Sequence, residues 1–282
     1  MTRNQPLLVA LVATGAVLAS FAAQADSPAW RDTPLGDRFA IELAAFYVMT
    51  DTDVFLEDSK YPGPGLFIDL EDSLDLDDGK TIPLVFAKWR FTERNTLRYV
   101  YWDLERSSNN NFDIDLGTIG GEPFGPSIRG DFDIATHQLS YTYSFVFNAE
   151  RDFYAGIVLS YMDIDLALVD EGGFLDPVKE SVGAPVPAFV IGYDWAFRPD
   201  WVWRNTASAM AMALAINDDD DMEGYASSLS STLEWRATRY LSVTAGYDFY
   251  QLDAEYDRSR KRQRWKLDYF YHGPRLGLLL RF

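Results

Sequence analysis

A two-residue alternation of apolar and polar side chains recurs along almost the whole chain and restricts its fold more than any other feature. In residues 139–147, LSYTYSFVF, large apolar side chains alternate with small or polar ones. Residues 39–49, 189–197 and 241–250 show the same period. Successive side chains of a β-strand point to opposite faces, so this period predicts strands with one apolar and one polar face.

The connections between these stretches are of two sizes, which alternate along the chain. Short ones occupy 92–95, 148–152, 198–201 and 238–240, and long polar ones lie near 57–79, 107–130, 169–183, 217–224 and 256–264. Tight turns at one end and longer loops at the other are typical of transmembrane β-barrels. We therefore expect an all-β, closed antiparallel barrel of ten strands, with eight or twelve left open and both termini at the short-turn, periplasmic end. The expected strands are 38–56, 80–92, 95–106, 131–148, 151–168, 185–198, 201–216, 225–238, 240–256 and 265–282.

Residues 1–25 have the composition of a secretory signal peptide. Arg3 precedes an apolar run that begins at Leu7, and the sequence AQA ends at Ala25. Such a segment is removed on export, which would leave residues 26–282 as one barrel domain. A retained membrane anchor is the alternative, although the run is short for a spanning helix of about 20 residues. No later stretch is apolar for that length, which excludes a bundle of membrane-spanning helices.

Charge and cysteine content exclude several classes of function. The chain has 43 acidic and 25 basic residues, and a nucleic-acid partner is not expected because phosphate binding needs basic surfaces. Cysteine is absent, which excludes disulfides and thiolate chemistry. No glycine-rich phosphate motif follows a strand and opens a helix. We expect no cofactor and no metal site.

The apolar side chains could point inward, as in a soluble lipocalin-type barrel, or outward to lipid. Transfer of Lys or Arg from the other face to the middle of a bilayer would cost about 2–4 kcal/mol. We therefore expect an apolar surface facing lipid and a polar lumen. Aromatic residues near the short turns would form a girdle at a membrane interface: Trp89, Phe91, Phe145, Phe147, Phe153, Trp195, Phe197, Trp203 and Trp235. The expected lumen charges are Glu42, Lys88, Arg90, Arg98, Asp194, Arg204, Glu234, Arg236, Asp248 and Arg275.

These lumen charges have two interpretations. They could line a path for ions or small solutes. They could also pair with one another in a closed interior, because side chains nearly fill a narrow barrel. We favour the closed interior.

The last nine residues, PRLGLLLRF, continue the alternation to the end of the sequence. Arg275 should face the lumen and Arg281 only the rim, while Leu276, Leu278, Leu280 and Phe282 should face lipid. This ending resembles the C-terminal signal of Gram-negative outer-membrane β-barrel proteins. In that family, the barrel-assembly machinery recognises a last strand that ends in Phe.

The resemblance covers the whole of residues 26–282, because the turn pattern and aromatic belts also fit. It is to small barrels of the OmpA-transmembrane or OmpW type, and to an uncharacterised group of outer-membrane β-barrels. The sequences LGDRFAIELAAFYVMTDTDV, DLEDSLDLDD and LSYTYSFVF carry it. It implies an outer-membrane location, contact with lipid and lipopolysaccharide, and periplasmic chaperones in transit.

Two strands break the simple pattern. Gly273–Pro274 suggests a bulge that would shift the lipid face between Tyr271 and Leu276. In residues 203–216, small side chains follow Trp203 on the expected outward face. We favour a bulge that exchanges the faces within this strand. The alternative is a patch that contacts a partner, although we expect a monomer.

The long loops carry opposite charges. Residues 51–58, 69–80 and 217–224 are rich in carboxylates, which hard cations prefer, but the twelfth residue from Asp75 is Phe86, so the EF-hand spacing fails. We favour solvated loops there. The basic run at 257–266 could bind lipopolysaccharide phosphates, because Arg pairs with phosphate bidentately. The residues of this expected contact are Arg258, Arg260, Lys261, Arg262, Arg264 and Lys266.

An enzyme is not expected. Omptin proteases also have ten strands and carry an Asp–His dyad and an Asp pair at the outer rim, but this chain has only two histidines, His137 and His272, and none of the omptin motifs. We therefore predict an integral outer-membrane β-barrel with a structural or narrow porin-like channel role. The alternative is a surface protein whose loops bind lipopolysaccharide, divalent cations or an external ligand.

Overall fold

The computed structural model describes residues 33–58, 66–69, 71, 78–107, 112–113, 118–119, 122–123, 127–170, 178–217, 220–258 and 263–282. The expected signal peptide lies outside these residues. Ten long strands form the barrel: β1 (Phe39–Asp58), β3 (Gly79–Arg90), β4 (Asn95–Ser107), β8 (Ser127–Phe147), β9 (Arg151–Asp170), β10 (Val178–Arg198), β11 (Trp201–Asn217), β12 (Asp220–Trp235), β13 (Leu241–Arg258) and β14 (Gln263–Arg281). Four short strands lie in the long connections: β2 (Leu66–Asp69), β5 (Phe112–Asp113), β6 (Thr118–Ile119) and β7 (Glu122–Pro123).

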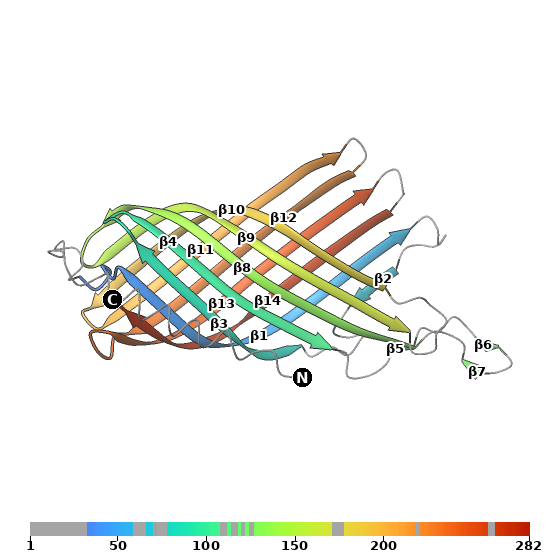
Figure 1. Cartoon of the computed structure of the whole chain (residues 1–282), viewed down its shortest axis with the longest axis horizontal. Coiled ribbons are helices and arrows are strands. Elements are labelled where there is room, and N and C mark those ends of the chain that lie inside the picture. Colours follow the sequence, from blue (N-terminus) through green and yellow to red (C-terminus); the bar gives the residue numbers. More distant parts are fainter. Residues whose placement is uncertain are drawn as a thin grey trace, which may run out of the picture.

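The sheet is closed by pairing of its first and last strands. Each barrel strand pairs antiparallel with the next one along the chain, and β14 pairs with β1 from Arg281 opposite Ala40 to Gln263 opposite Asp58 (Figure 1). The amide of Phe282 donates to the carbonyl of Phe39 over 2.8 Å, which extends this seam to the last residue. The predicted ten-strand closed barrel is therefore confirmed, and closure satisfies the backbone groups that an edge strand would expose.

The short turns gather at one end of the barrel, on the left in Figure 1, where β1 begins and β14 ends. We call this the short-turn end and the opposite one the loop end. The described residues include no helix that is long and apolar enough to cross a membrane.

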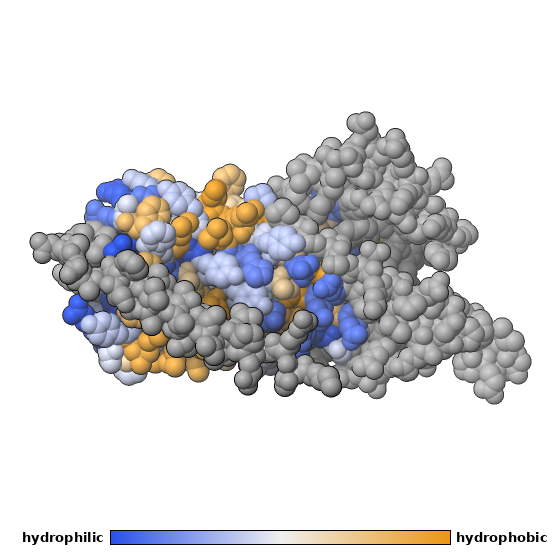
Figure 2. All heavy atoms as spheres, in the orientation of Figure 1, coloured by the Kyte–Doolittle hydropathy of each residue, from blue (hydrophilic) through white to orange (hydrophobic). Residues whose placement is uncertain are grey.

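A belt of exposed apolar side chains surrounds the half of the barrel nearest the short turns, where Figure 2 shows orange patches. Aromatic rings are exposed next to the turns, and aliphatic side chains follow them toward the loop end. We call this surface the apolar belt. Its aromatic members at the short turns include Trp89, Phe91, Phe145, Phe153, Trp195, Phe197, Trp203 and Trp235. Its aliphatic members include Leu43, Leu139, Ile157, Leu159, Ile191, Leu229, Leu276, Leu278 and Leu280.

One expected girdle residue lies on the other side of the sheet. The register of β8 against β9 shifts between Ser144 and Val146, and Phe145 and Val146 are both exposed. This bulge turns Phe147 inward, where it packs against the buried cluster of Leu35, Ala196 and Val202 and beneath the guanidinium of Arg90. The prediction for Phe147 was wrong because an extra residue in one strand inverts every later side chain.

The two faces of the sheet exchange roles toward the loop end. Beyond the apolar belt, most inward side chains are apolar and form one buried cluster, which includes Phe132, Ile134, Met162, Leu252, Leu267 and Tyr269. The outward side chains there are acidic. Glu105, Asp133 and Asp165 are direct partners on β4, β8 and β9, and Asp253, Asp268 and Asp53 are direct partners on β13, β14 and β1. The expectation of a polar lumen is therefore correct for the short-turn half, whereas in the loop half apolar side chains predominate and surround a few buried polar residues such as Arg106 and Thr52.

This exchange also explains the two irregular strands without a bulge. The register of β11 against β12 is unbroken from Trp201 to Ala215, and that of β13 against β14 is unbroken throughout. Both predicted bulges were wrong. Met210 packs inward because β11 has passed beyond the apolar belt there, and Tyr271 of β14 is buried for the same reason. Pro274 simply points outward, where its side chain is exposed.

Candidate functional site

The barrel interior is the candidate site, because charged residues of every part of the sequence meet there. All ten expected lumen residues, from Glu42 to Arg275, are buried or half-buried on the inward side of the described barrel. The two-residue alternation of the strands explains this placement. On each strand, the expected lumen residues occupy the same alternate positions as the buried residues, and the residues of the apolar belt occupy the positions between them.

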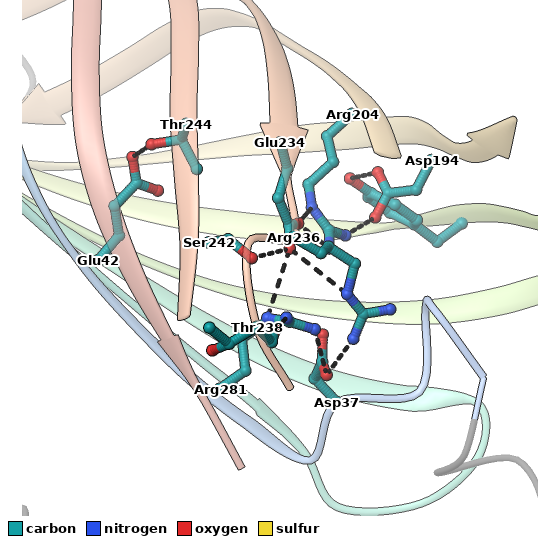
Figure 3. A network of polar contacts seen from close by, with 11 residues as sticks. Asp37, Glu42, Asp194, Arg204, Glu234, Arg236, Thr238, Ser242, Thr244 and Arg281 are labelled. Carbon is teal, nitrogen blue, oxygen red and sulfur yellow. Dashed lines mark hydrogen bonds and ion pairs between the residues drawn. The ribbon is translucent and has the colours of Figure 1, made fainter. Parts of the chain in front are cut away.

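Glu234 is the centre of a network that joins several strands at the short-turn end (Figure 3). Its carboxylate is 0% exposed and accepts hydrogen bonds from Arg204 Nη2 at 2.7 Å and from Ser242 Oγ at 2.7 Å. Arg281 Nε lies 3.6 Å from Oε1 of Glu234, and Arg236 Nε lies 4.0 Å from the same oxygen. Arg204 also donates to Asp194 over 2.6 Å.

Two members of this network were not expected. Asp37, which precedes β1, accepts from Arg236 Nη2 at 3.0 Å, and Arg281 Nη1 lies 3.5 Å from the same oxygen. Arg281 is only 1% exposed and donates to the carbonyl of Thr238 over 2.6 Å, so its predicted place at the rim was wrong. The alternation could not predict this burial, because it depends on tertiary structure: the segment before β1 brings Asp37 to the end of the lumen, where it contacts Arg281. Burial raises the pKa of the Asp37 carboxyl, and the charges of Lys88 and Arg236 oppose that effect.

A separate ion pair crosses the interior beside this network. Arg90 of β3 donates to Asp152 of β9, and both side chains are fully buried. The strands β4 and β8 lie between these two in the barrel, so the pair spans part of the lumen. Asp152 escaped the sequence analysis because it lies in the short connection 148–152. Further along, Arg275 Nε lies 3.2 Å from Asp248 and Nη2 donates to Thr232 over 2.6 Å.

Aromatic side chains fill the interior on the other side, toward the loop end. The hydroxyl of Tyr250 on β13 lies 3.2 Å from the sulfur of Met162 on β9, across three intervening strands. Phe132 of β8 and Tyr269 of β14 approach with ring centroids 6.4 Å apart. Contacts between strands so far apart in the barrel order mean that side chains occupy the cross-section at this level. We call this group, with Trp102 and Tyr271, the aromatic layer.

A cavity of about 190 Å³ lies between the network and the aromatic layer. Arg204 and Asp194 line it from one side, and Trp102 and Tyr271 line it from the other. Lys88, Arg98 and Glu42 of the expected lumen set also face it. The oxygen Oε1 of Glu42 accepts a hydrogen bond from Thr244 Oγ1 at 2.7 Å.

Beyond the aromatic layer, one more ion pair lies at the loop end. Arg106 pairs with Glu71 and donates to the hydroxyl groups of Thr50 over 2.7 Å and Thr52 over 3.0 Å. Arg106 carries no signal beyond alternation in the sequence, and Glu71 belongs to an acidic segment that we expected to be solvated. Among the described residues, no group of three or more His, Cys, Asp or Glu side chains could hold a metal ion.

The other expected sites are described only in part. Leu276, Leu278, Leu280 and Phe282 are exposed in the apolar belt. Of the basic run, Lys266 is exposed on the outward side and lies 3.2 Å from Asp253. Arg260, Lys261 and Arg262 lie outside the described residues, as do the side chains of Arg258 and Arg264.

Both histidines point away from the interior. His137 Nδ1 and the hydroxyl of Tyr99 are 2.8 Å apart, and the ring packs against Tyr101. His272 Nδ1 is 2.7 Å from the hydroxyl of Tyr247, and its ring stacks on Phe249. Both therefore belong to clusters of aromatic residues on the outer surface.

Comparison with known proteins supports the fold and no finer assignment. No family model and no curated protein sequence matches this chain. The structure is similar to the outer membrane protease OmpT from Escherichia coli, with a TM-score of 0.51 and 9% identity over 92% of this chain and 99% of that chain. Weaker likenesses include the translocator domain of the autotransporter NalP from Neisseria meningitidis (TM-score 0.42, 10% identity, 97% of this chain and 95% of that one) and the outer membrane protein OprG from Pseudomonas aeruginosa (TM-score 0.39, 10% identity, 87% and 96%). The chain has the fold of the outer-membrane β-barrel proteins.

Proposed function

We propose that this protein spans the outer membrane as a monomeric structural barrel with a closed interior, both termini facing the periplasm. The apolar belt supports the location, because strands of about 9–11 residues suffice to cross a bilayer and its exposed surface matches lipid. The observation that carries the closed interior is the aromatic layer, where Tyr250 meets Met162 across the lumen. The network around Glu234 closes the short-turn end in the same way.

Conductance in planar lipid bilayers tests this proposal. The purified barrel should give no steady ion current. A variant with Phe132, Met162 and Tyr269 all changed to Ala should conduct if Arg204→Ala also opens the Glu234 network and Arg90→Ala also removes the separate pair with Asp152. A matched control changes Leu139, Ile157 and Leu229 of the apolar belt to Ala and should stay silent. A steady current from the unmodified barrel would contradict the closed interior and favour the narrow channel.

We propose no enzymatic activity, since both histidines contact tyrosine hydroxyls and aromatic rings on the outer surface. Changing His137 and His272 to Gln should leave folding and any measured activity unchanged. Loss of a proteolytic or lipid-modifying activity in that variant would reverse this assignment.

A surface-binding role is the second candidate, and the length of the strands favours it. Strands such as β8 and β9 continue past the apolar belt and would hold the loops clear of the membrane. Lipopolysaccharide binding by the basic run is tested by changing Arg258, Arg260, Lys261, Arg262 and Arg264 to Gln. The matched control changes Arg94, Arg198 and Arg239 of the short turns. Equal binding of lipopolysaccharide micelles by both variants would exclude the basic run.

A further inference from the structure

Lys88 is a buried cation that no described residue contacts through a hydrogen bond or an ion pair. Its side chain is 5% exposed and lines the cavity. Lysine is almost never fully buried unless it is paired, because an isolated charge loses its hydration. The carboxylate of Asp37 attracts Lys88 electrostatically, but Asp37 is already paired with Arg236 and Arg281, so no carboxylate is dedicated to Lys88 among the described residues.

A second cation lies directly opposite. Lys88 of β3 and Arg98 of β4 are register partners on the inward face, so their side chains leave the sheet side by side. Like charges in this relation destabilise a sheet. Within the described residues, Arg98 donates only to the neutral hydroxyl of Thr142, and its guanidinium lies 4.1 Å from the ring centre of Tyr154.

The remaining charges at the cavity do not cancel this pair. Arg204 is paired with Asp194, and Arg275 with Asp248. Glu42 is the one remaining carboxylate among the described residues that line the cavity. Lys88 and Arg98 thus leave one excess positive charge over Glu42, although the chain as a whole carries a net charge of −18.

Part of the cavity wall is apolar, and the hydroxyl or amide groups of residues such as Gln138, Ser140 and Thr206 line the remainder. Phe46, Trp102, Val158, Val190 and Leu279 line the apolar part. Its volume of about 190 Å³ is below the 300–1,000 Å³ of pockets for drug-sized ligands, so only a small molecule fits. A ligand that contacts both the two cations and the apolar side chains of this cavity would have one negative group and a compact apolar body.

We propose that this cavity binds a small organic anion, a monocarboxylate with an apolar body, whose carboxylate is held by Lys88 and Arg98. The anion neutralises the excess charge, and its body packs against Trp102 and Phe46. The site goes beyond the structural role proposed above, because a closed interior and a resident anion are tested separately.

The test is refolding of the barrel with benzoate, followed by thermal unfolding measured as the heat-dependent shift in electrophoretic mobility. A ligand that binds only the folded state raises the midpoint with its concentration. We expect such a rise for the unmodified chain, and a loss of at least tenfold in apparent benzoate affinity for Lys88→Met and for Arg98→Gln. Lys266→Met, on the outer surface, is the control and should respond as the unmodified chain does.

Each outcome decides the matter. Lys88→Met should also unfold at a higher temperature than the unmodified chain without benzoate, because it removes the like-charge pair. Sodium chloride at equal ionic strength should not reproduce the benzoate effect, and inorganic phosphate should bind more weakly because it lacks an apolar body. No response of the unmodified chain, an unchanged response of Lys88→Met, or an equal effect of chloride would overturn the proposal. An equal effect of phosphate would overturn the part played by the apolar wall.

Discussion

Glu234 combines complete burial with a full negative charge, which a protein interior tolerates only where cations and donors surround the group. Three arginines and a serine surround it here, and they come from β11, β13, β14 and the turn after β12. The carboxylate therefore links elements that are far apart in sequence. Its loss would leave three buried cations with fewer partners.

Glu234→Gln should lower the free energy of unfolding by about 3 kcal/mol or more, the usual cost of breaking a buried ion pair. Equilibrium unfolding in urea, in lipid vesicles, measures this change. Glu93→Gln, in an exposed short turn, is the matched control and should have no effect. Equal stability of the two variants would show that the network adds nothing to the folded state.

Gly273 illustrates a constraint of backbone approach. A Cβ atom at this position would lie 1.8 Å from the carbonyl oxygen of Tyr47, so the seam between β14 and β1 would have to move. Gly273→Ala should therefore destabilise the barrel by about 1–3 kcal/mol or more. At Gly277 the nearest atoms belong to the side chains of Glu42 and Thr244, which can rotate away. Gly277→Ala should cost less in the same urea titration, and the reverse order would contradict this account.

At the scale of elements, one strand serves two environments. On β14, Leu276 and Leu278 face outward at the apolar belt, whereas Tyr269 and Leu267 face inward nearer the loop end. The pleat does not change between them, since the register is continuous. Only the surroundings change. The apolar residues of this strand therefore lie on the outer face in the apolar belt and on the inner face nearer the loop end.

The acidic rows on the outer face follow from this exchange and have a measurable cost. Asp268 lies directly between Asp253 and Asp53 of the neighbouring strands. Like charges in this position cost about 0.2–1 kcal/mol, and salt screens them. Asp268→Asn should therefore stabilise the barrel at low ionic strength and lose that advantage in about 1 M salt. Asp200→Asn in a short turn serves as control, and a gain that does not depend on salt would point to another cause.

The last strand carries both the closing seam and the expected assembly signal. The backbone of Phe282 makes the terminal hydrogen bonds with β1, while its ring is exposed. Phe282→Ala keeps the backbone bonds, so the purified folded barrel should retain its stability. The same variant should reach the outer membrane in smaller amounts, measured as the heat-modifiable band in membrane fractions. Leu278→Ala is the comparison, and normal assembly of Phe282→Ala would remove the signal from this residue.

For the whole molecule, the orientation in the membrane can be tested directly because the chain has no cysteine. Glu105→Cys lies at the loop end of β4, and Asp200→Cys lies in a short turn. A membrane-impermeant maleimide should label Glu105→Cys on intact cells and Asp200→Cys only after the outer membrane is permeabilised. The opposite labelling pattern would place the termini outside.

The sequence by itself determined the barrel. Alternation over long stretches, with short and long connections in turn, led to ten strands whose predicted bounds lie within a few residues of the observed ones, apart from β10 and β12, which start earlier than predicted. The same alternation placed all ten predicted charges on the inward side. These features are local, because the strand period and the turn lengths depend only on neighbouring residues.

Tertiary structure decided which inward residues meet. Asp37 and Arg281 are at opposite ends of the barrel domain and share an ion pair only because the sheet closes. The bulge in β8 that turns Phe147 inward leaves no mark in the alternation before it. The exchange of faces at the loop end depends on where each strand leaves the apolar belt, which is set by strand tilt and length around the whole barrel. Periodicity gives the side of the sheet on which a residue lies, but packing and solvent across the closed barrel determine what it contacts there.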